Sequence, residues 1–235
     1  MNDVKTSDRG RCPVQDEMNA AAGRGTVYGV LLNHRGALAA LGDAVHAPPY
    51  KAPPKAPVLY IKPRNTWIGP GDAIVVPAGI DELEVGATLG LVIGRAACRV
   101  AGDQALAHVR GYVIVNDVSV PHPSFYRPSL RYKARDTFCS IGPVVPKTAI
   151  GSPDALDIEV SIDGAVVHHW RTRDLLRPAA KLLADVTDFM TLTPGDVLMI
   201  GVGAGAPRAR AGQRVSIAVA GIGRLDNPLT AEGAA

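Results

Sequence analysis

The 235-residue sequence has few aromatic residues, only three cysteines and no long apolar run. Aromatic residues make up 5% of the chain. Cys12, Cys98 and Cys139 have neither CxxC nor Cys/His metal spacing, which argues against a disulfide framework and a zinc site. No apolar stretch approaches the roughly 20 residues of a membrane helix, and the polar first 25 residues do not resemble a signal peptide. We therefore expect a cytoplasmic protein with reduced thiols and no membrane partner.

Runs of like charge are also missing. The 25 basic and 22 acidic side chains give a formal net charge of +3, and no cluster of Lys or Arg follows the pattern that tracks phosphate groups. Nucleic acid is therefore not an expected partner. What the sequence does have is 47% hydrophobic residues, enough for one large core. No interior linker indicates a second domain.

The two ends of the chain differ from its middle. Residues 1–24 lack apolar periodicity, and residues 230–235 are small and polar. Such segments cannot bury enough apolar surface to offset the entropy of ordering. We expect disordered tails at 1–24 and 230–235 around a single domain at 25–229.

The domain is predicted to be β-rich. Short apolar runs bounded by Gly, Pro, Asn or Asp predict strands, and only 104–109 and 178–190 have helical character, the latter behind a first-turn proline. Strands and helices do not alternate regularly, so a doubly wound parallel sheet is not expected. The fold class predicted is β-rich α+β. The predicted strands are 27–33, 58–62, 73–76, 89–93, 112–115, 158–162, 197–200 and 215–219.

Five segments carry a family resemblance. They are YIKPRNTWIGPGDAIVVP at 60–77, GATLGLVIGRAA at 86–97, GYVIVNDVS at 111–119, KARDTFCSIGP at 133–143, and the closing TLTPGDVLMIG with AGIGRLDNP. In this order and spacing, they resemble the fumarylacetoacetate hydrolase family, which implies a mixed β-roll. NHRGALAAL, APPYKAPPK, SFYRP and HHWRTRDLL are most similar to the N-terminal half of its 4-hydroxyphenylacetate-degrading isomerase/decarboxylase subgroup.

The resemblance implies a metal site that this sequence does not complete. In the family, two Glu and one Asp hold Mg²⁺ or Mn²⁺, which chelates a 2-oxo acid and stabilises its enolate. The Asp is present as Asp117, whereas the two Glu positions are Gly86 and Thr88. One carboxylate seldom retains Mg²⁺, so no cofactor is predicted for this chain. Glu82 and Glu84 have Glu-x-Glu spacing, but they lie four residues out of register, and we interpret them as solvated loop acids.

Two other family features are changed. The His and Glu of the general base pair correspond to Ala37 and Ala40, and the Thr that binds a substrate carboxylate corresponds to Val202. Lys133 matches the active-site Lys of the family. We therefore predict Lys133 and Asp117 as catalytic residues, because an ammonium beside an enolate supplies part of the stabilisation that a metal would give.

Further basic residues are candidates for binding substrate carboxylates. Arg64, Arg127, Arg35 and His34 are predicted in this role, since a guanidinium binds a carboxylate with two parallel hydrogen bonds. A lone surface Arg is more often solvated or ion-paired than a ligand. His168, His169 and Cys139 are predicted to be structural.

Three functional hypotheses follow from the resemblance. The first is isomerisation of 2-hydroxyhepta-2,4-diene-1,7-dioate, or decarboxylation of its tricarboxylate precursor, because both reactions pass through a dienolate. The second is a helper subunit that assembles with a metal-bearing paralogue, and the third is a metal-dependent acylpyruvate hydrolase. The expected partner is a small dicarboxylate, with the chain forming a homo-oligomer or joining a paralogous C-terminal subunit.

Overall fold

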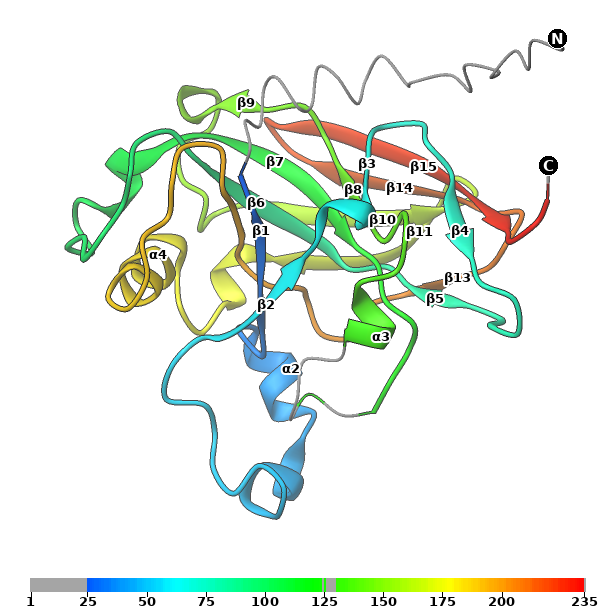
Figure 1. Cartoon of the computed structure of the whole chain (residues 1–235), viewed down its shortest axis with the longest axis horizontal. Helices are drawn as coiled ribbons and strands as arrows, with labels where there is room; N and C mark the ends of the chain where they lie inside the picture. Colours follow the sequence, from blue (N-terminus) through cyan, green and yellow to red (C-terminus); the bar gives the residue numbers. More distant parts are fainter. Residues whose placement is uncertain (1–24, 124, 126–129, 235) are drawn as a thin grey trace, which may run out of the picture.

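The computed structural model describes residues 25–123, 125 and 130–234. The predicted tail at 1–24 lies outside these residues. The chain forms one large sheet, a second sheet and a small two-stranded ribbon (Figure 1). The strands are β1 (Val27–Leu31), β2 (Val58–Lys62), β3 (Trp67–Ile68), β4 (Ile74–Val76), β5 (Leu83–Glu84), β6 (Ala87–Ile93), β7 (Val109–Asp117), β8 (Cys139–Ile141), β9 (Val145–Pro146), β10 (Asp157–Ile162), β11 (Ala165–Arg171), β12 (Val197–Met199), β13 (Arg208–Ala209), β14 (Arg214–Val219) and β15 (Gly223–Ala231).

The large sheet has the order β2-β1-β12-β6-β7-β8-β3, with β9 also paired to β7. It is mixed, because β1 with β12 and β3 with β8 run parallel while the other pairs are antiparallel. The second sheet has the order β11-β10-β14-β15-β4, and β13 pairs with β5. The prediction of a β-rich fold with mixed sheets is confirmed.

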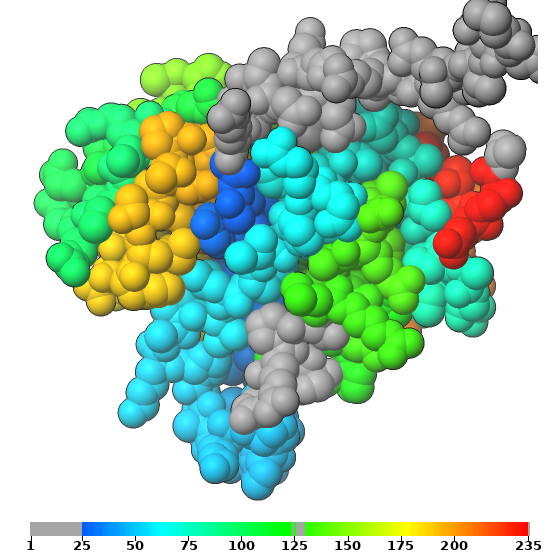
Figure 2. Space-filling view, in the orientation of Figure 1, coloured from blue at the N-terminus to red at the C-terminus, as the bar shows by residue number. Residues whose placement is uncertain are grey.

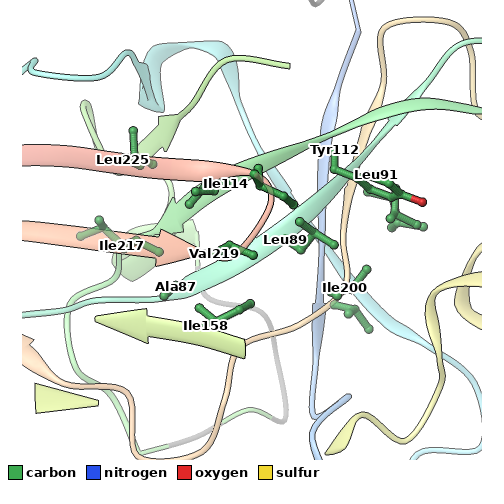
Figure 3. Close-up of a cluster of buried hydrophobic side chains, with 14 of the residues drawn as sticks. Ala87, Leu89, Leu91, Tyr112, Ile114, Ile158, Ile200, Ile217, Val219 and Leu225 are labelled. Carbon is green, nitrogen blue, oxygen red and sulfur yellow. The ribbon is translucent and has the colours of Figure 1, made fainter. Parts of the chain in front are cut away.

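The core lies between the two sheets. Figure 3 shows Leu89 of β6 and Ile114 of β7 near Ile158, Ile217 and Leu225 of the second sheet, and all five are buried. Both faces of β6 are covered, since all seven of its residues are buried. Burying such aliphatic side chains stabilises the fold by about 1.5–3 kcal/mol each before chain entropy is counted.

Helices are short and lie outside the sheets. The longest among the described residues is α4 (Ala179–Thr187), which buries Leu182, Leu183 and Val186 in the same core. The prediction of a helix near 178–190 is therefore confirmed, whereas 104–109 contains only a 3₁₀ turn. The other helical segments are α2 (Arg35–Ala39), α3 (Leu130–Lys133), and the 3₁₀ turns η1 (Gly42–His46), η2 (Arg64–Thr66), η3 (Ala105–His108), η4 (Lys147–Ala149) and η5 (Thr172–Asp174).

Two regions differ from expectation at the periphery. The segment with α2 and η1 stands out from the body of the sheets in light blue (Figure 2), and no helix was predicted there because α2 spans only five residues. At the other end, β15 continues to Ala231, past the predicted domain boundary.

No helix of the described residues is long and apolar enough to cross a membrane.

Candidate active site

The site begins with two side chains of β2. Successive side chains of a strand point to opposite faces, so Tyr60 and Lys62 share one face while Ile61 lies on the other. Tyr60 and Lys62 are buried and Ile61 is exposed. The Lys62 ammonium donates hydrogen bonds to the backbone oxygens of Val118, Lys133 and Phe138 at 2.7, 2.8 and 2.8 Å. These bonds fix a fully buried charge in place.

Asp117 is the acidic partner of this charge. It is the last residue of β7 and is buried, with its Oδ1 2.8 Å from Lys62 Nζ. Its Oδ2 lies 3.2 Å from Lys133 Nζ, and the Tyr60 hydroxyl donates a hydrogen bond to the same oxygen. We call Tyr60, Lys62, Asp117 and Lys133 the buried cluster. Two ammonium groups and one carboxylate give it a net positive charge.

Lys133 reaches the buried cluster from α3, where it is the last residue. Its ammonium also lies 4.7 Å from the centre of the Tyr60 ring, a distance at which the ring face attracts a cation. The Lys133 side chain is 8% exposed, whereas the Lys62 side chain is 0% exposed. Lys133 is therefore the cation of the cluster that a substrate can touch.

The environment fixes the charge states of the cluster. Burial alone would raise the pKa of Asp117, but the charges of Lys133 and Lys62 and the hydrogen bonds outweigh it and lower this pKa to about 2. Burial lowers the pKa of Lys62, although Asp117 acts in the opposite direction. The pKa of Tyr60 is raised well above its usual value by burial and by the adjacent Asp117. Asp117 is thus ionised at neutral pH and Tyr60 keeps its proton.

A cavity of about 290 Å³ opens onto the cluster. This volume is near the lower end of the range for small-molecule sites, roughly 300 Å³. Tyr60, Asp117 and Lys133 of the buried cluster line its wall together, and Glu84 and Arg208 add two more charged side chains. The remaining lining residues are small or apolar: Val30, Leu31, Leu32, Ala37, Ala40, Gly86, Phe125, Val202, Gly203, Ala204, Gly205 and Ala206.

The residues at the family metal positions do not fit a divalent ion. Gly86 has no carboxylate, and a Cβ there would lie 2.2 Å from the backbone oxygen of Asp117. The Thr88 hydroxyl donates to the Gly201 oxygen at 2.5 Å, and both Asp117 oxygens face ammonium groups. Within the described part of the chain, no group of three or more His, Cys, Asp or Glu residues has the arrangement of a metal site.

The positions of the missing base pair and the missing Thr all face the cavity. Ala37 belongs to α2, Ala40 follows it, and Val202 lies on the loop after β12. Asn33 holds this wall together, since its amide donates to Ile200 and Arg177 oxygens at 2.8 and 3.0 Å. These three family positions thus line the cavity, but Ala37, Ala40 and Val202 supply no acid, base or hydroxyl there.

Three of the four predicted carboxylate-binding residues, Arg64, Arg35 and His34, do not line this cavity. Arg64 is exposed, with its guanidinium carbon 5.4 Å from the Trp67 ring centre, and Arg35 is exposed at the start of α2. His34 is buried and caps α2 by accepting a hydrogen bond from the Gly36 N–H at 3.1 Å. Burial lowers the pKa of His34, which favours the neutral ring. Arg127 lies outside the described residues.

The interpretation of Glu84 as a solvated loop acid is wrong. Glu84 belongs to β5, is half-buried and lines the cavity, because the pairing of β5 with β13 carries it there. Glu82 instead forms an ion pair with Arg208 at 2.7 Å. Lys62 and Tyr60 were also missed, although both lie in a predicted strand at the spacing that places them on one face.

Comparison with known proteins agrees with this geometry. A family model described as fumarylacetoacetate (FAA) hydrolase C-terminal matches residues 26–230. This chain belongs to the fumarylacetoacetate hydrolase family. Its fold is the β-rich mixed fold of that family, as predicted.

Individual relatives refine the placement within the fumarylacetoacetate hydrolase family. A 4-hydroxyphenylacetate degradation bifunctional isomerase/decarboxylase from Salmonella dublin is 43% identical over 209 residues, which cover 89% of this chain and 48% of that protein. The chain thus spans about half the length of the curated relatives it matches. A 2-hydroxyhepta-2,4-diene-1,7-dioate isomerase from Mycobacterium marinum has a TM-score of 0.72 at 30% identity, covering 88% of this chain and 75% of that one.

A metal-bound structure shows the same fold at lower identity. Fumarylpyruvate hydrolase from Pseudomonas aeruginosa, in complex with Mn²⁺ and pyruvate, has a TM-score of 0.77 at 24% identity and covers 88% of this chain and 90% of that one. A member of this fold thus binds Mn²⁺, while the metal positions of this chain carry Gly86 and Thr88.

Proposed function

We propose that this chain is an isomerase subunit that converts a 2-hydroxy-2,4-dienoate dicarboxylate, of the 2-hydroxyhepta-2,4-diene-1,7-dioate type, into its 2-oxo-3-ene isomer. The observation that carries the proposal is the net positive buried cluster, three of whose members line the cavity. The reaction passes through a dienolate whose negative charge must be stabilised. Lys133 is the cation of the buried cluster that faces the cavity, and Asp117 and Tyr60 hold it in position.

The role proposed for each residue of the buried cluster follows from the exposure of its side chain. Lys62 is fully enclosed, so its role is to fix the charge and position of Asp117 rather than to touch substrate. Lys133 is proposed to bind the 2-oxygen of the substrate as the enolate forms. Fixed charges in a site that excludes water stabilise such an oxyanion without reorganising during the reaction. Arg208, on the cavity wall, is a candidate for the distal carboxylate.

Isomerisation fits this site better than decarboxylation or acylpyruvate hydrolysis. It moves a proton between conjugated carbons, whereas the other two reactions break a carbon–carbon bond. The family positions for the metal and the base pair hold Gly86, Thr88, Ala37 and Ala40. Isomerisation is therefore the reaction that we propose, because it needs the least stabilisation of negative charge.

A helper subunit is the second candidate function. It is favoured by the half-length match to bifunctional relatives together with the changed metal positions. In this case the chain would assemble with a paralogue that corresponds to the remaining half of those relatives. The proposed assembly is at least a dimer, either of this chain or with such a paralogue.

One assay distinguishes the two functions. The purified chain is incubated with the dienol diacid, alone and with the paralogue, and loss of the conjugated diene absorbance is followed. Turnover by the chain alone supports the isomerase. No turnover alone, with stimulation of the paralogue, supports the helper subunit and overturns the isomerase.

A further inference from the structure

Glu84 is a cavity residue that the family pattern does not assign. Leu83, its neighbour in β5, is fully buried in the core, so strand alternation turns Glu84 toward the other side, where the cavity lies. The backbone at this point is fixed on both edges of the ribbon. The Glu84 N–H donates to the Ser119 oxygen at 2.8 Å, and the Val85 N–H donates to the Pro207 oxygen at 2.8 Å.

These backbone bonds also place Glu84 beside the buried cluster. Ser119 lies two residues after Asp117, and its N–H donates to the backbone oxygen of Glu84 at 3.2 Å. Glu84 and Lys133 line the same cavity and interact through their charges. An anionic group bound by the Lys133 ammonium would therefore be within the same small volume as the Glu84 carboxyl.

The other charged side chains of the cavity wall, Asp117, Lys133 and Arg208, each have an ion-pair partner. Asp117 faces two ammonium groups and the Tyr60 hydroxyl, and Arg208 is paired with Glu82. Among the described residues, the Glu84 carboxyl has no hydrogen-bond partner. It interacts through its charge with Lys133, His122, Asp117 and Arg208. Partial burial raises the pKa of Glu84, and Lys133 offsets this only in part. Its carboxyl is thus the one on the described wall that is both open to the cavity and suited to exchange a proton.

We propose that Glu84 is the proton carrier of the isomerisation, in place of the His and Glu that the family has at positions 37 and 40. This inference rests on the proposed isomerase function. The Glu84 carboxylate takes the proton from the 2-hydroxyl group, and the oxygen electrons form the C2 carbonyl. The double bonds at C2–C3 and C4–C5 become one at C3–C4. The protonated Glu84 then gives the same proton to C5, so no other reactant is consumed.

The test compares wild type with Glu84→Gln, which keeps the shape of the side chain but cannot carry the proton. We expect kcat to fall by about 10²- to 10⁴-fold, as for loss of a general acid–base. Glu84→Asp should recover part of the loss. Glu159→Gln is the matched control, because Glu159 is also a half-buried strand glutamate but does not line the cavity, and its kcat should match wild type.

A second measurement separates proton transfer from a structural effect. In D₂O, wild type should place deuterium at C5 in a single configuration, whereas the residual product of Glu84→Gln should have mixed configuration at C5. Binding of a saturated 2-oxo dicarboxylate to both proteins should be alike, which shows that the cavity is intact.

Each result has a definite meaning. Glu84→Gln turnover within threefold of wild type, with one C5 configuration, would overturn the proton carrier and leave the isomerase function standing. Wild-type protein without turnover would overturn the isomerase function and this role with it. Loss of turnover with mixed C5 configuration supports the proposal.

Discussion

Two charge clusters of this molecule have similar members in very different surroundings. The buried cluster joins Lys62 and Lys133 to Asp117, whose side chains are 0%, 8% and 1% exposed. On the edge strand β11, His169 and Arg171 both contact Asp157 of β10, at 2.9 and 2.7 Å, and these side chains are 44% to 57% exposed. We call these three residues the surface cluster.

The comparison shows what burial adds to an ion pair. Water screens and competes for the charges of the surface cluster, so such pairs contribute little to stability. In the buried cluster, each group removed from water depends on its partners, and the loss of one leaves another uncompensated. The contacts with Asp117 and Tyr60 also hold the Lys133 ammonium at a defined place on the cavity wall. Only the buried cluster is therefore expected to matter for both folding and activity.

The largest effect on stability is expected from Lys62→Met. The change removes the partner of Asp117 Oδ1 and leaves three buried backbone oxygens without their donor. We expect a loss of at least about 3 kcal/mol in the free energy of unfolding, as for removal of one partner of a buried pair. Urea denaturation measures it. A loss below about 1 kcal/mol would contradict a buried ion pair between Lys62 and Asp117.

Lys133→Met is expected to affect activity more than stability. Asp117 keeps Lys62 and Tyr60, while the cavity loses the one cation of the buried cluster that lines it. Loss of one oxyanion donor costs about 2–4 kcal/mol of transition-state stabilisation, so kcat should fall by roughly 10²- to 10³-fold. Turnover and melting temperature are measured together. Unchanged turnover with unchanged stability would make Lys133 a spectator and favour the helper subunit.

Acid should destabilise the protein through Asp117. The folded pKa of about 2 lies below the usual value for Asp, near 3.9. A carboxyl with a depressed folded pKa contributes stability that is present above its unfolded pKa and lost as the pH falls through the folded pKa. The window is therefore about pH 4 to 2, and the contribution is roughly 2.5 kcal/mol. Equilibrium unfolding across this range would show no such loss in Asp117→Asn.

The smallest effect is expected at the surface cluster. Asp157→Asn removes the acceptor shared by His169 and Arg171, but all three side chains are solvated. The melting temperature should stay within experimental error, and turnover should be unchanged. A shift comparable to that of Lys62→Met would remove the distinction between the clusters.

The sequence predicted those parts that local pattern determines. The strand content and the helix near 178–190 follow from apolar spacing, and both are confirmed. The helices α2 and α3 were missed, since five and four residues are too few to show a helical period. The start of α2 is set by a local cap, in which the Gly36 N–H donates to His34 Nδ1, whereas the sequence predicted His34 as a ligand of a substrate carboxylate.

The site was predictable only in part for a similar reason. Asp117 and Lys133 lie in motifs, and the structure brings them within 3.2 Å of each other. Lys62 depends on three carbonyl groups from distant segments, which no local pattern reveals. Glu84 was assigned to solvent because its strand has only two residues and pairs far along the chain with β13.

The central claim is that the buried cluster stabilises the dienolate without a divalent ion. The most direct test is the initial rate of the chain alone on the dienol diacid, after treatment with a chelator and then with millimolar Mg²⁺ or Mn²⁺ added. We predict equal rates in the two conditions, and in both a rate at least 100-fold lower for Lys133→Met. Activity that appears only with added metal, or that survives loss of the Lys133 charge, would contradict the claim.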